Sequence, residues 1–271
     1  MAANYPPLNS LVPALWLEIF GVYSEWSGRY ALPVNTLSII IPVLNESAAL
    51  KANLPLLQHW RREGHEVIVV DGGSIDDSIT TCTGLVDHLM TTTAGRARQM
   101  NAGARIARGE VLMFLHIDTL LPTISPQFLL QALTAGSGYT WGRFDVRLTG
   151  THPAFRVIET MMNLRSRLTG IATGDQAMFV RRDIFEQAGG FADIPLMEDV
   201  RLSKVLRART GQPLCLHERV HSSSRRWEKH GIVRTVVLMW WLRLAYVLGV
   251  DPERLHRRYY RHKDAVDRSS G

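Results

Sequence analysis

Three short apolar runs, each followed at once by polar or acidic side chains, constrain the fold of this 271-residue chain more than any other feature. The runs are LSIIIPV at 37–43, EVIVV at 66–70 and VLMFL at 111–115. Continuous apolar runs are typical of strands that are buried on both faces, and strands that alternate with helices form a parallel sheet. The sequence therefore predicts an α/β fold, with helices at 48–62 and 99–108 between these strands.

Polar side chains follow all three runs, at the sheet edge where open α/β folds bind ligands. Asn45 and Glu46 follow the first run, Asp71 the second, and His116 and Asp118 the third. The chain has no GxxxxGK[ST] or GxGxxG motif, so the nucleoside-triphosphatase and dinucleotide-binding classes lose their main support. The HIDT segment also differs from the aspartyl-phosphate phosphatases, whose motif begins with a nucleophilic carboxylate. An acidic cluster is left to define the site.

The alternation of strands and helices weakens after residue 121. We expect the later strands at 141–148 and 174–180, and the later helices at 155–168, 183–188 and 199–209. The chain shows no internal repeat and no low-complexity linker. We therefore expect an N-terminal extension (1–36), one catalytic domain (37–220) and a basic helical segment packed on or beside it (221–271).

The net charge of +6 comes from the end of the chain. Residues 1–200 hold 15 Lys and Arg against 19 Asp and Glu, whereas residues 201–271 hold 16 against 6. Such a basic end suits nucleic acid, an anionic membrane surface or an anionic substrate, and a merely solvated surface has the same composition.

The cysteines and apolar stretches bear on where the protein acts. Cys82 and Cys215 form no CxxC pair, which fits a reducing compartment and excludes a disulfide scaffold. The apolar stretch 11–23 lacks a basic flank and is broken by proline and glutamate, so we expect no cleaved signal peptide. The stretch 236–242 is too short to cross a bilayer. We expect a cytoplasmic protein, with peripheral contact at the inner face of the membrane as a further option.

Six motifs occur in the order typical of the family 2 glycosyltransferases of the GT-A fold, which the chain resembles from about residue 37 to 260. They are IIPVLNE at 40–46, VVDGGSIDDS at 69–78, GRARQMNAGARIARGE at 95–110, FLHIDT at 114–119, GDQAMFVRRDIFEQAGGF at 174–191 and MEDVRLSKVLR at 197–207. Within that family, the combination of HxD with NLRSRLTG, GDQ, IPLMED and RRWE is similar to the branch named for arsenosugar biosynthesis. The resemblance implies a Rossmann-like, mostly parallel sheet with a helical C-terminal appendage. It also implies metal-dependent inverting transfer from a nucleoside-diphosphate sugar, with UDP-sugars favoured, to a hydroxyl acceptor.

The resemblance implies that Glu46 and Asp71 hold the ribose and base of the nucleotide. Asp71 would accept a hydrogen bond from uracil N3–H, although an Asp before Gly-Gly also caps turns. Glu46 would equally suit a helix N-terminus, and the arginines before NAG at 101–103 match a basic site near the nucleotide. The full nucleotide-binding set is Pro42, Asn45, Glu46, Asp71, Gly73, Arg96, Arg98 and His116.

The family's metal motif is DxD, and this chain departs from it. Asp118 keeps the last acid, which the resemblance implies binds Mn²⁺ or Mg²⁺ at the two phosphates, whereas His116 replaces the first. A ring nitrogen at 116 would favour Mn²⁺, or it would hydrogen-bond the ribose instead. His221 matches a late histidine ligand of many GT-A enzymes, but a lone histidine before three serines is also typical of a surface.

Glu198 and Asp199 match the family's ED motif. The resemblance implies that Asp199 takes the proton of the acceptor hydroxyl, with Glu198 as the alternative base, although both acids also suit a helix N-terminus. Asp175 of the GDQ motif would orient the acceptor or the sugar. The acceptor candidates are side chains that stack on sugars or donate to anions, namely Trp141, Arg165, Arg167, Arg225, Arg226 and Trp227.

Two other function classes stay open. A sugar nucleotidyltransferase has a similar architecture, but it needs a glycine-rich basic loop where this chain has LNESAALK. A non-enzymatic RNA- or membrane-surface-binding protein would use the basic end, and we expect no specific nucleic-acid recognition. The segment 231–263 is apolar on nearly every helical face before a basic and aromatic stretch. It either completes the catalytic domain or docks on a membrane or an amphiphilic acceptor.

Overall fold

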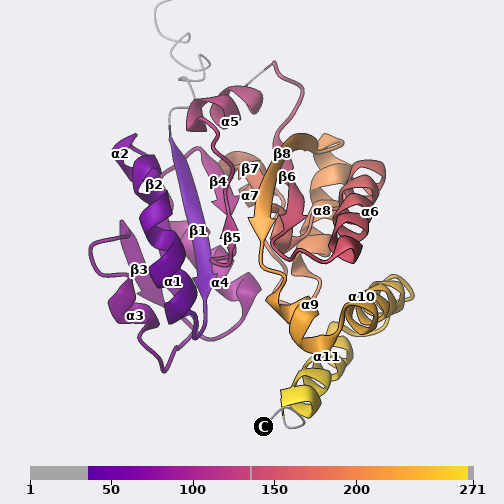
Figure 1. Ribbon diagram of the computed structural model, residues 1–271. Coiled ribbons are helices and arrows are strands. Elements are labelled where there is room, and N and C mark those ends of the chain that lie inside the picture. Colours follow the sequence, from indigo (N-terminus) through magenta and orange to yellow (C-terminus); the bar gives the residue numbers. More distant parts are fainter. Residues whose placement is uncertain (1–35, 135, 268–271) are drawn as a thin grey trace, which may run out of the picture. The chain divides into compact units, whose positions relative to one another are not determined.

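The computed structural model describes residues 36–134 and 136–267, and its first half is the predicted parallel sheet (Figure 1). The parallel strands, in the spatial order β3-β2-β1-β4, are β1 (Leu37–Val43), β2 (Glu66–Asp71), β3 (His88–Thr91) and β4 (Val111–Phe114). Every residue of β1 and β4 is buried, as expected for strands covered on both faces. The predicted N-terminal extension (1–36), which includes the apolar stretch 11–23, lies outside the described residues apart from residue 36.

The second half of the sheet has mixed strand directions. It continues past β4 in the order β7-β6-β8-β5, with β7 antiparallel to β4 and to β6. These strands are β5 (Thr119–Leu120), β6 (Trp141–Leu148), β7 (Phe179–Arg181) and β8 (Leu214–Ser222). The prediction of one strand over 174–180 was wrong at its start, because Gly174–Gln176 forms the 3₁₀ turn η3. Strand β8 was not predicted and extends past the expected domain boundary at residue 220.

Helices cover both faces of the parallel half (Figure 1). The single helix predicted at 48–62 is interrupted by a 3₁₀ turn that contains Pro55, which has no backbone N–H to donate. The segments of this half are α1 (Ser47–Asn53), η2 (Leu54–Leu57), α2 (Gln58–Arg62), α3 (Ser78–Thr81), α4 (Arg96–Ile106) and α5 (Pro126–Ala132). Ile39 and Ile41 belong to one core cluster, which includes α1 and α2, whereas Ile40 belongs to the other, with α4. The period of two along β1 therefore builds a core on each face.

The later helices surround the mixed half and the C-terminal region. They are α6 (Pro153–Thr169), α7 (Arg182–Gln187), α8 (Glu198–Thr210), α9 (Arg225–His230), α10 (Ile232–Val247) and α11 (Pro252–Asp267). Leu242 and Ala245 of α10 form a third cluster with Leu196, Met197 and Val200 around the start of α8. The C-terminal helices thus pack against the element that carries the ED motif. No helix within the described ranges is long and apolar enough to span a membrane.

Candidate functional site

The end of β2 places Asp71 in a buried turn with one oxygen unused. Its Oδ2 accepts hydrogen bonds from the backbone N–H groups of Gly73 (2.8 Å) and Ser74 (2.9 Å), so the turn-capping role is real. Its Oδ1 is buried and has no hydrogen-bond partner. Gly73 has φ +93°, a left-handed backbone that favours glycine. The turn thus fixes a carboxylate whose second oxygen is still available as an acceptor.

The loop after β1 is bonded to the loop after β2. Asn45 accepts from Ile75 N–H through Oδ1 (2.9 Å), and its own N–H donates to Ser74 Oγ (2.8 Å). Sequence reasoning missed Asp76, which accepts from the N–H groups of Ser47 and Ser78 and from the Ser78 hydroxyl. These hydrogen bonds, that of the Ser78 side chain foremost, lower the pKa of Asp76 to about 2. The position of Asp76 within SIDDS was the available signal.

Gln99 on α4 connects the ends of β1 and β2 by hydrogen bonds. Sequence reasoning did not identify it. Its Nε2 donates to the carbonyls of Val43 and Val70, both at 2.8 Å. A Cβ on Gly72 would lie 3.1 Å from the same nitrogen, so this turn has little room for a side chain. The strand ends that carry Glu46 and Asp71 are therefore held by a fully buried amide.

Arg96 and Arg98 leave the start of α4 toward different partners. Arg96 Nε lies 3.1 Å from Glu198 Oε1, which joins the start of α4 to the ED motif. Arg98 pairs with Asp193 at 2.8 Å, and both side chains are more than half exposed. The structure thus brings Arg96 into the candidate site, whereas Arg98 forms a surface ion pair.

The segment after β4 brings His116 next to the GDQ turn. The His116 ring contacts Gly174 so closely that a Cβ there would collide with it, and its Nδ1 lies 3.7 Å from Asp175 Oδ1. Asn53 Nδ2 fixes the segment by donating to Ile117 O (2.6 Å). Asp118 is partly buried, and its carboxylate has no hydrogen-bond or ion-pair partner among the described residues.

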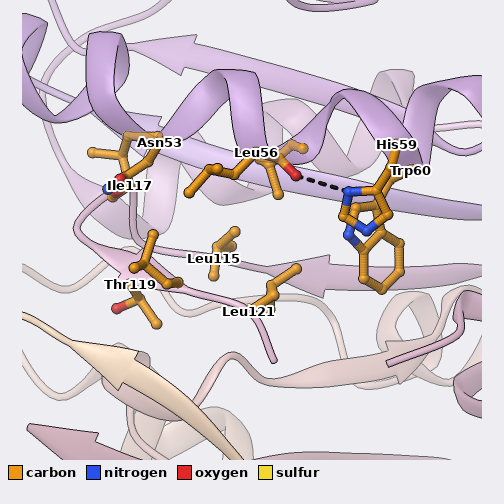
Figure 2. A pocket seen from close by; sticks show the side chains of 10 residues that line it. Asn53, Leu56, His59, Trp60, Leu115, Ile117, Thr119 and Leu121 are labelled. Carbon is orange, nitrogen blue, oxygen red and sulfur yellow. Dashed lines mark hydrogen bonds between the residues drawn. The ribbon is translucent and has the colours of Figure 1, made fainter. Parts of the chain in front are cut away.

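Beneath this segment lies a shallow pocket, shown in Figure 2. It contains no residue predicted for the nucleotide, the metal or the acceptor. Its lining comes from the end of α1, from η2 and α2, and from β5 with its flanking residues. It comprises Asn53, Leu56, Leu57, His59, Trp60, Leu115, Ile117, Thr119, Leu120 and Leu121. We assign it no role in the chemistry.

The ED motif forms the start of α8, and its two acids differ in environment. Asp199 Oδ2 accepts from Gly174 N–H at 2.9 Å, which joins the ED motif to the GDQ turn. Glu198 is only 3% exposed, and its Oε2 has no hydrogen-bond partner. Burial raises the pKa of Glu198 above its usual value, although the Arg96 guanidinium opposes this shift. Asp199 is the more accessible of the two acids.

Arg165 on α6 faces the two acids from the other side. Its guanidinium interacts electrostatically with Asp199 and Asp175, yet Nε and one terminal nitrogen are buried without a hydrogen-bond partner. Burial lowers its pKa from the usual value. Donors left unsatisfied beside carboxylates favour binding of a polar or anionic group.

Two of the other predicted acceptor residues, Trp141 and Arg167, are held by contacts elsewhere in the fold. Trp141 is fully buried in the core and donates from its indole to Gly211 O (3.2 Å), so the prediction that it stacks on an acceptor was wrong. Arg167 is bonded to Asp145 (2.8 Å) and to the carbonyl of Cys215 (3.0 Å), which makes it a link between α6 and the sheet. Arg225, Arg226 and Trp227 lie in the short helix α9, with Trp227 partly buried.

Three non-glycine residues with left-handed backbones lie beside the candidate acids. They are Asn45 (φ 56°), Ala177 (φ 44°) and Met197 (φ 70°). Each comes one or two residues from an acid of the predicted set, namely Glu46, Asp175 and Glu198. Conformations of this kind cost about 1–3 kcal/mol each and cluster at functional sites.

The described residues contain no preformed cluster of protein side chains that could hold a metal ion by itself. Within residues 36–134 and 136–267, no group of three or more His, Cys, Asp and Glu side chains could hold an ion. His221 lies exposed on β8, opposite Leu120 in the strand register. The unpartnered Asp118 carboxylate still fits a Mn²⁺ or Mg²⁺ ion that takes its other ligands from phosphate oxygens and water.

The family model for glycosyl transferase family 2 matches residues 38–189, more than half of the chain. The chain belongs to this family. The match covers β1 to α7 and includes Asp71, Asp118 and Asp175, while Glu198 and Asp199 follow it closely. A search of curated protein sequences finds no match.

Solved structures of glycosyltransferases share the fold of this family 2 member. S. aureus TarS is 15% identical, with a TM-score of 0.57 over 70% of this chain and 60% of that one. The mannosyltransferase PcManGT from Pyrobaculum calidifontis, solved with GDP-Man and Mn²⁺, is 19% identical, with a TM-score of 0.55 over 79% and 62%. The glucosyl-3-phosphoglycerate synthase of Mycobacterium tuberculosis, solved with Mn²⁺, UDP and glucosyl-3-phosphoglycerate, is 17% identical, with a TM-score of 0.52 over 69% and 71%. The fold is thus that of the GT-A glycosyltransferases, and the chain spans about 60% of the first two structures.

Proposed function

We propose that the protein is a metal-dependent, inverting glycosyltransferase that moves a sugar from a nucleoside-diphosphate sugar to a hydroxyl acceptor. The observation that carries this proposal is the meeting of three distant segments in one site. His116 contacts the GDQ turn, that turn donates to Asp199, and Glu198 pairs with Arg96. The residues proposed to bind the nucleotide and the acids of the ED motif thus lie in one site.

The donor nucleotide is assigned to the ends of β1 and β2. Asp71 Oδ1 is a buried acceptor without a partner, which suits the N3–H of uracil, and UDP-sugars are therefore the favoured donors. Pro42, Asn45, Glu46 and Gly73 shape the surrounding turns. Arg96 and His116 lie at the side that faces the acids, where the diphosphate is expected.

The divalent ion is assigned to Asp118, with Mn²⁺ or Mg²⁺ as the candidates. When bound, such an ion neutralises the diphosphate oxygens and so stabilises the leaving nucleoside diphosphate. His116 Nδ1 lies near Asp175 and leaves the other ring nitrogen as a second ligand or as a donor to the nucleotide. His221 is the weaker ligand candidate, because it is exposed on β8.

Asp199 is the proposed general base. It removes the proton from the acceptor hydroxyl as the oxygen attacks the anomeric carbon, opposite the departing nucleoside diphosphate. The hydrogen bond from Gly174 N–H keeps one carboxylate oxygen in place. Glu198 suits this role less, because its burial and its pairing with Arg96 hold it away from solvent.

Asp175 and Arg165 are assigned to the acceptor and the transferred sugar. Asp175 is about half exposed and can accept from sugar hydroxyls, while Arg165 has unsatisfied donors for an anionic or polar acceptor group. Arg226 and Trp227 remain acceptor candidates from their place in α9. The motifs NLRSRLTG and RRWE support the branch named for arsenosugar biosynthesis, and this assignment rests on the sequence. We further propose a cytoplasmic location, since both cysteines are free.

A donor-hydrolysis screen tests this proposal. The purified protein is incubated with UDP-, GDP- and other nucleoside-diphosphate sugars, with and without Mn²⁺, and the released nucleoside diphosphate is measured. We expect turnover of at least one donor that depends on the metal, and loss of metal-stimulated UDP binding in Asp118→Ala. Release of pyrophosphate from a nucleoside triphosphate and a sugar phosphate would instead identify a nucleotidyltransferase.

A further inference from the structure

Helix α10 presents an entirely apolar face to solvent. Seven apolar residues on α10 and its C-cap are between 40% and 75% exposed. These residues, which we call the α10 outer face, are Val233, Val237, Trp240, Trp241, Leu244, Val247 and Leu248. At 100° per residue they span about a third of the helix circumference. A surface helix of a globular protein normally shows polar residues there.

The opposite face of α10 already packs on the core of the domain. The exposed outer face is therefore not the face by which α10 is attached to the domain. Thr235, Leu242 and Ala245 are buried, and the last two pack on Leu196, Met197 and Val200. Lys204 of α8 lies over the Tyr246 ring at 5.4 Å. The helix is therefore anchored through one face and exposes the other.

Basic residues lie beside the α10 outer face and along α11, which packs against α10. The Arg258 guanidinium lies over the Trp241 ring at 4.4 Å, and Arg254 and Arg257 are exposed on the same helix, α11. Arg234 is exposed next to Val233. Residues 225–271 hold 11 Lys and Arg against 5 Asp and Glu. An apolar, tryptophan-containing face with a cationic border is complementary to an anionic lipid surface.

Helix α6 has the same inverted pattern. Val157, Met161, Leu164 and Leu168 are 46–72% exposed along one stripe, while Glu159 is buried. Ile171, just past the end of α6, packs against the third core cluster, to which α10 contributes. A second apolar stripe thus ends near α10.

We propose that the α10 outer face docks the protein on an anionic membrane surface. A second copy of the chain is the less favourable occupant, because pairing two such faces would bring two strongly basic borders together. Met197, which precedes the ED motif, packs with the inner face of α10. Docking would therefore hold the start of α8 close to the lipid surface, where an amphiphilic acceptor is available. The docking itself does not depend on the proposed reaction.

Vesicle flotation tests the docking with the full chain. Vesicles of phosphatidylcholine plus phosphatidylglycerol are compared with vesicles of phosphatidylcholine alone, at low and high salt. We expect the protein to float with the anionic vesicles and to dissociate as salt rises, because surface charges are screened. Trp240→Ala and Leu244→Ala should each weaken partitioning about tenfold, and Arg254→Gln combined with Arg257→Gln about fivefold per charge.

Two matched control variants distinguish docking through α10 from non-specific binding to the vesicles. Phe128→Ala removes an aromatic side chain that is 45% exposed on α5, and Arg105→Gln removes an exposed charge on α4. Both should float like the wild type. Circular dichroism of each variant checks that α10 remains folded.

Three outcomes would overturn the proposal. The first is failure of the wild type to float with anionic vesicles at low salt. The second is flotation that the outer-face variants leave unchanged. The third is a dimer in light scattering that the same variants dissociate, which would assign the face to a second copy. Donor turnover is measured separately without vesicles, so failure of docking and failure of the proposed reaction are distinguishable.

Discussion

The two halves of the sheet are built by different means. In the parallel half, β1 and β4 are wholly buried and, apart from Ser38, apolar, and short polar contacts such as those of Asn45 and Gln99 hold the loops. In the mixed half, β6 carries Arg143, which is fully buried and paired with Asp145. The half proposed to bind the nucleotide is thus an apolar frame with shaped turns, whereas the half proposed to bind the acceptor depends on buried charges.

Helix α6 illustrates the second mode of construction. It faces β6 with polar side chains: Glu159 accepts from Leu148 N–H, and Asn163 exchanges two hydrogen bonds with the backbone of Val146. Four of its apolar residues, Val157, Met161, Leu164 and Leu168, are exposed to solvent instead. Buried polar networks specify one arrangement only when every member is satisfied. The mixed half of the sheet is therefore the more sensitive to single polar substitutions.

The largest effect is expected from the proposed base. Asp199→Asn should lower the transfer rate about 10²–10⁴-fold, because general-base catalysis supplies an acceleration of that size. Its oxygen can still accept from Gly174, so the fold should persist. Steady-state kinetics with the donor from the screen, compared with Glu198→Gln, measure the effect. A variant that keeps most of the wild-type kcat would move the base to Glu198 or Asp175.

The buried charge network should show the next largest effect, this time on stability. Asp145→Ala leaves Arg143 buried without its partner, and breaking a buried pair costs about 3–5 kcal/mol. Urea unfolding followed by circular dichroism measures the change in free energy. A loss below about 1 kcal/mol, the size expected of a surface ion pair, would contradict the contrast between the two halves.

The two faces of α10 offer a matched pair of substitutions. Leu242→Ala removes a fully buried side chain and should lower the free energy of unfolding by about 2–5 kcal/mol. Trp240→Ala removes one that is 60% exposed and should change it by about 0.5 kcal/mol or less. Equal losses in urea unfolding would show that the outer face stabilises the fold.

The smallest effect concerns the pH dependence of stability, which should have opposite signs in the two halves. The Asp76 pKa is lowered from 3.8 to about 2, so its contribution is present above pH 3.8 and is lost as the pH falls toward 2. The Glu198 pKa is raised above 4.5, so stability falls as the pH rises from 4.5 through the raised value. We measure the urea midpoint of unfolding as a function of pH. Its slope should become smaller below pH 3.8 in Asp76→Asn, and smaller above pH 4.5 in Glu198→Gln. Unchanged slopes in both variants would reject these shifts.

The sequence predicted the parallel half well because its strands are continuous apolar runs. The shorter or more polar strands β3, β5 and β8 were missed: β3 has four residues with alternating burial, and β8 reads LCLHERVHS. Their strand state comes from pairing with distant neighbours, which local propensity does not encode. The outward apolar face of α10 could not be predicted either, since its sequence is apolar on both faces.

The sequence singles out the candidate acids, but it does not predict their contacts. Asp71, Asp118 and Asp199 stand out from the strand ends and motifs. The pairing of Arg96 with Glu198 joins segments far apart in the chain, and nothing local distinguishes Arg96 from Arg98. Trp141 was misassigned because the sequence does not distinguish an aromatic residue of the core from one of a binding site when it begins a strand. Burial, which only the fold supplies, decides between the two.

The most direct test of the proposed site compares one isosteric variant from each half. Calorimetry with UDP and Mn²⁺ gives the nucleotide affinity of Asp71→Asn and of Asp199→Asn, and the transfer rate of each is measured in parallel. We expect Asp71→Asn to lose nucleotide affinity, because an amide N–H donor can replace its unpartnered acceptor oxygen. We expect Asp199→Asn to bind UDP like the wild type, while transfer is lost. Unchanged UDP affinity in Asp71→Asn, or equal loss of affinity in both variants, would contradict the division of the site between the two halves.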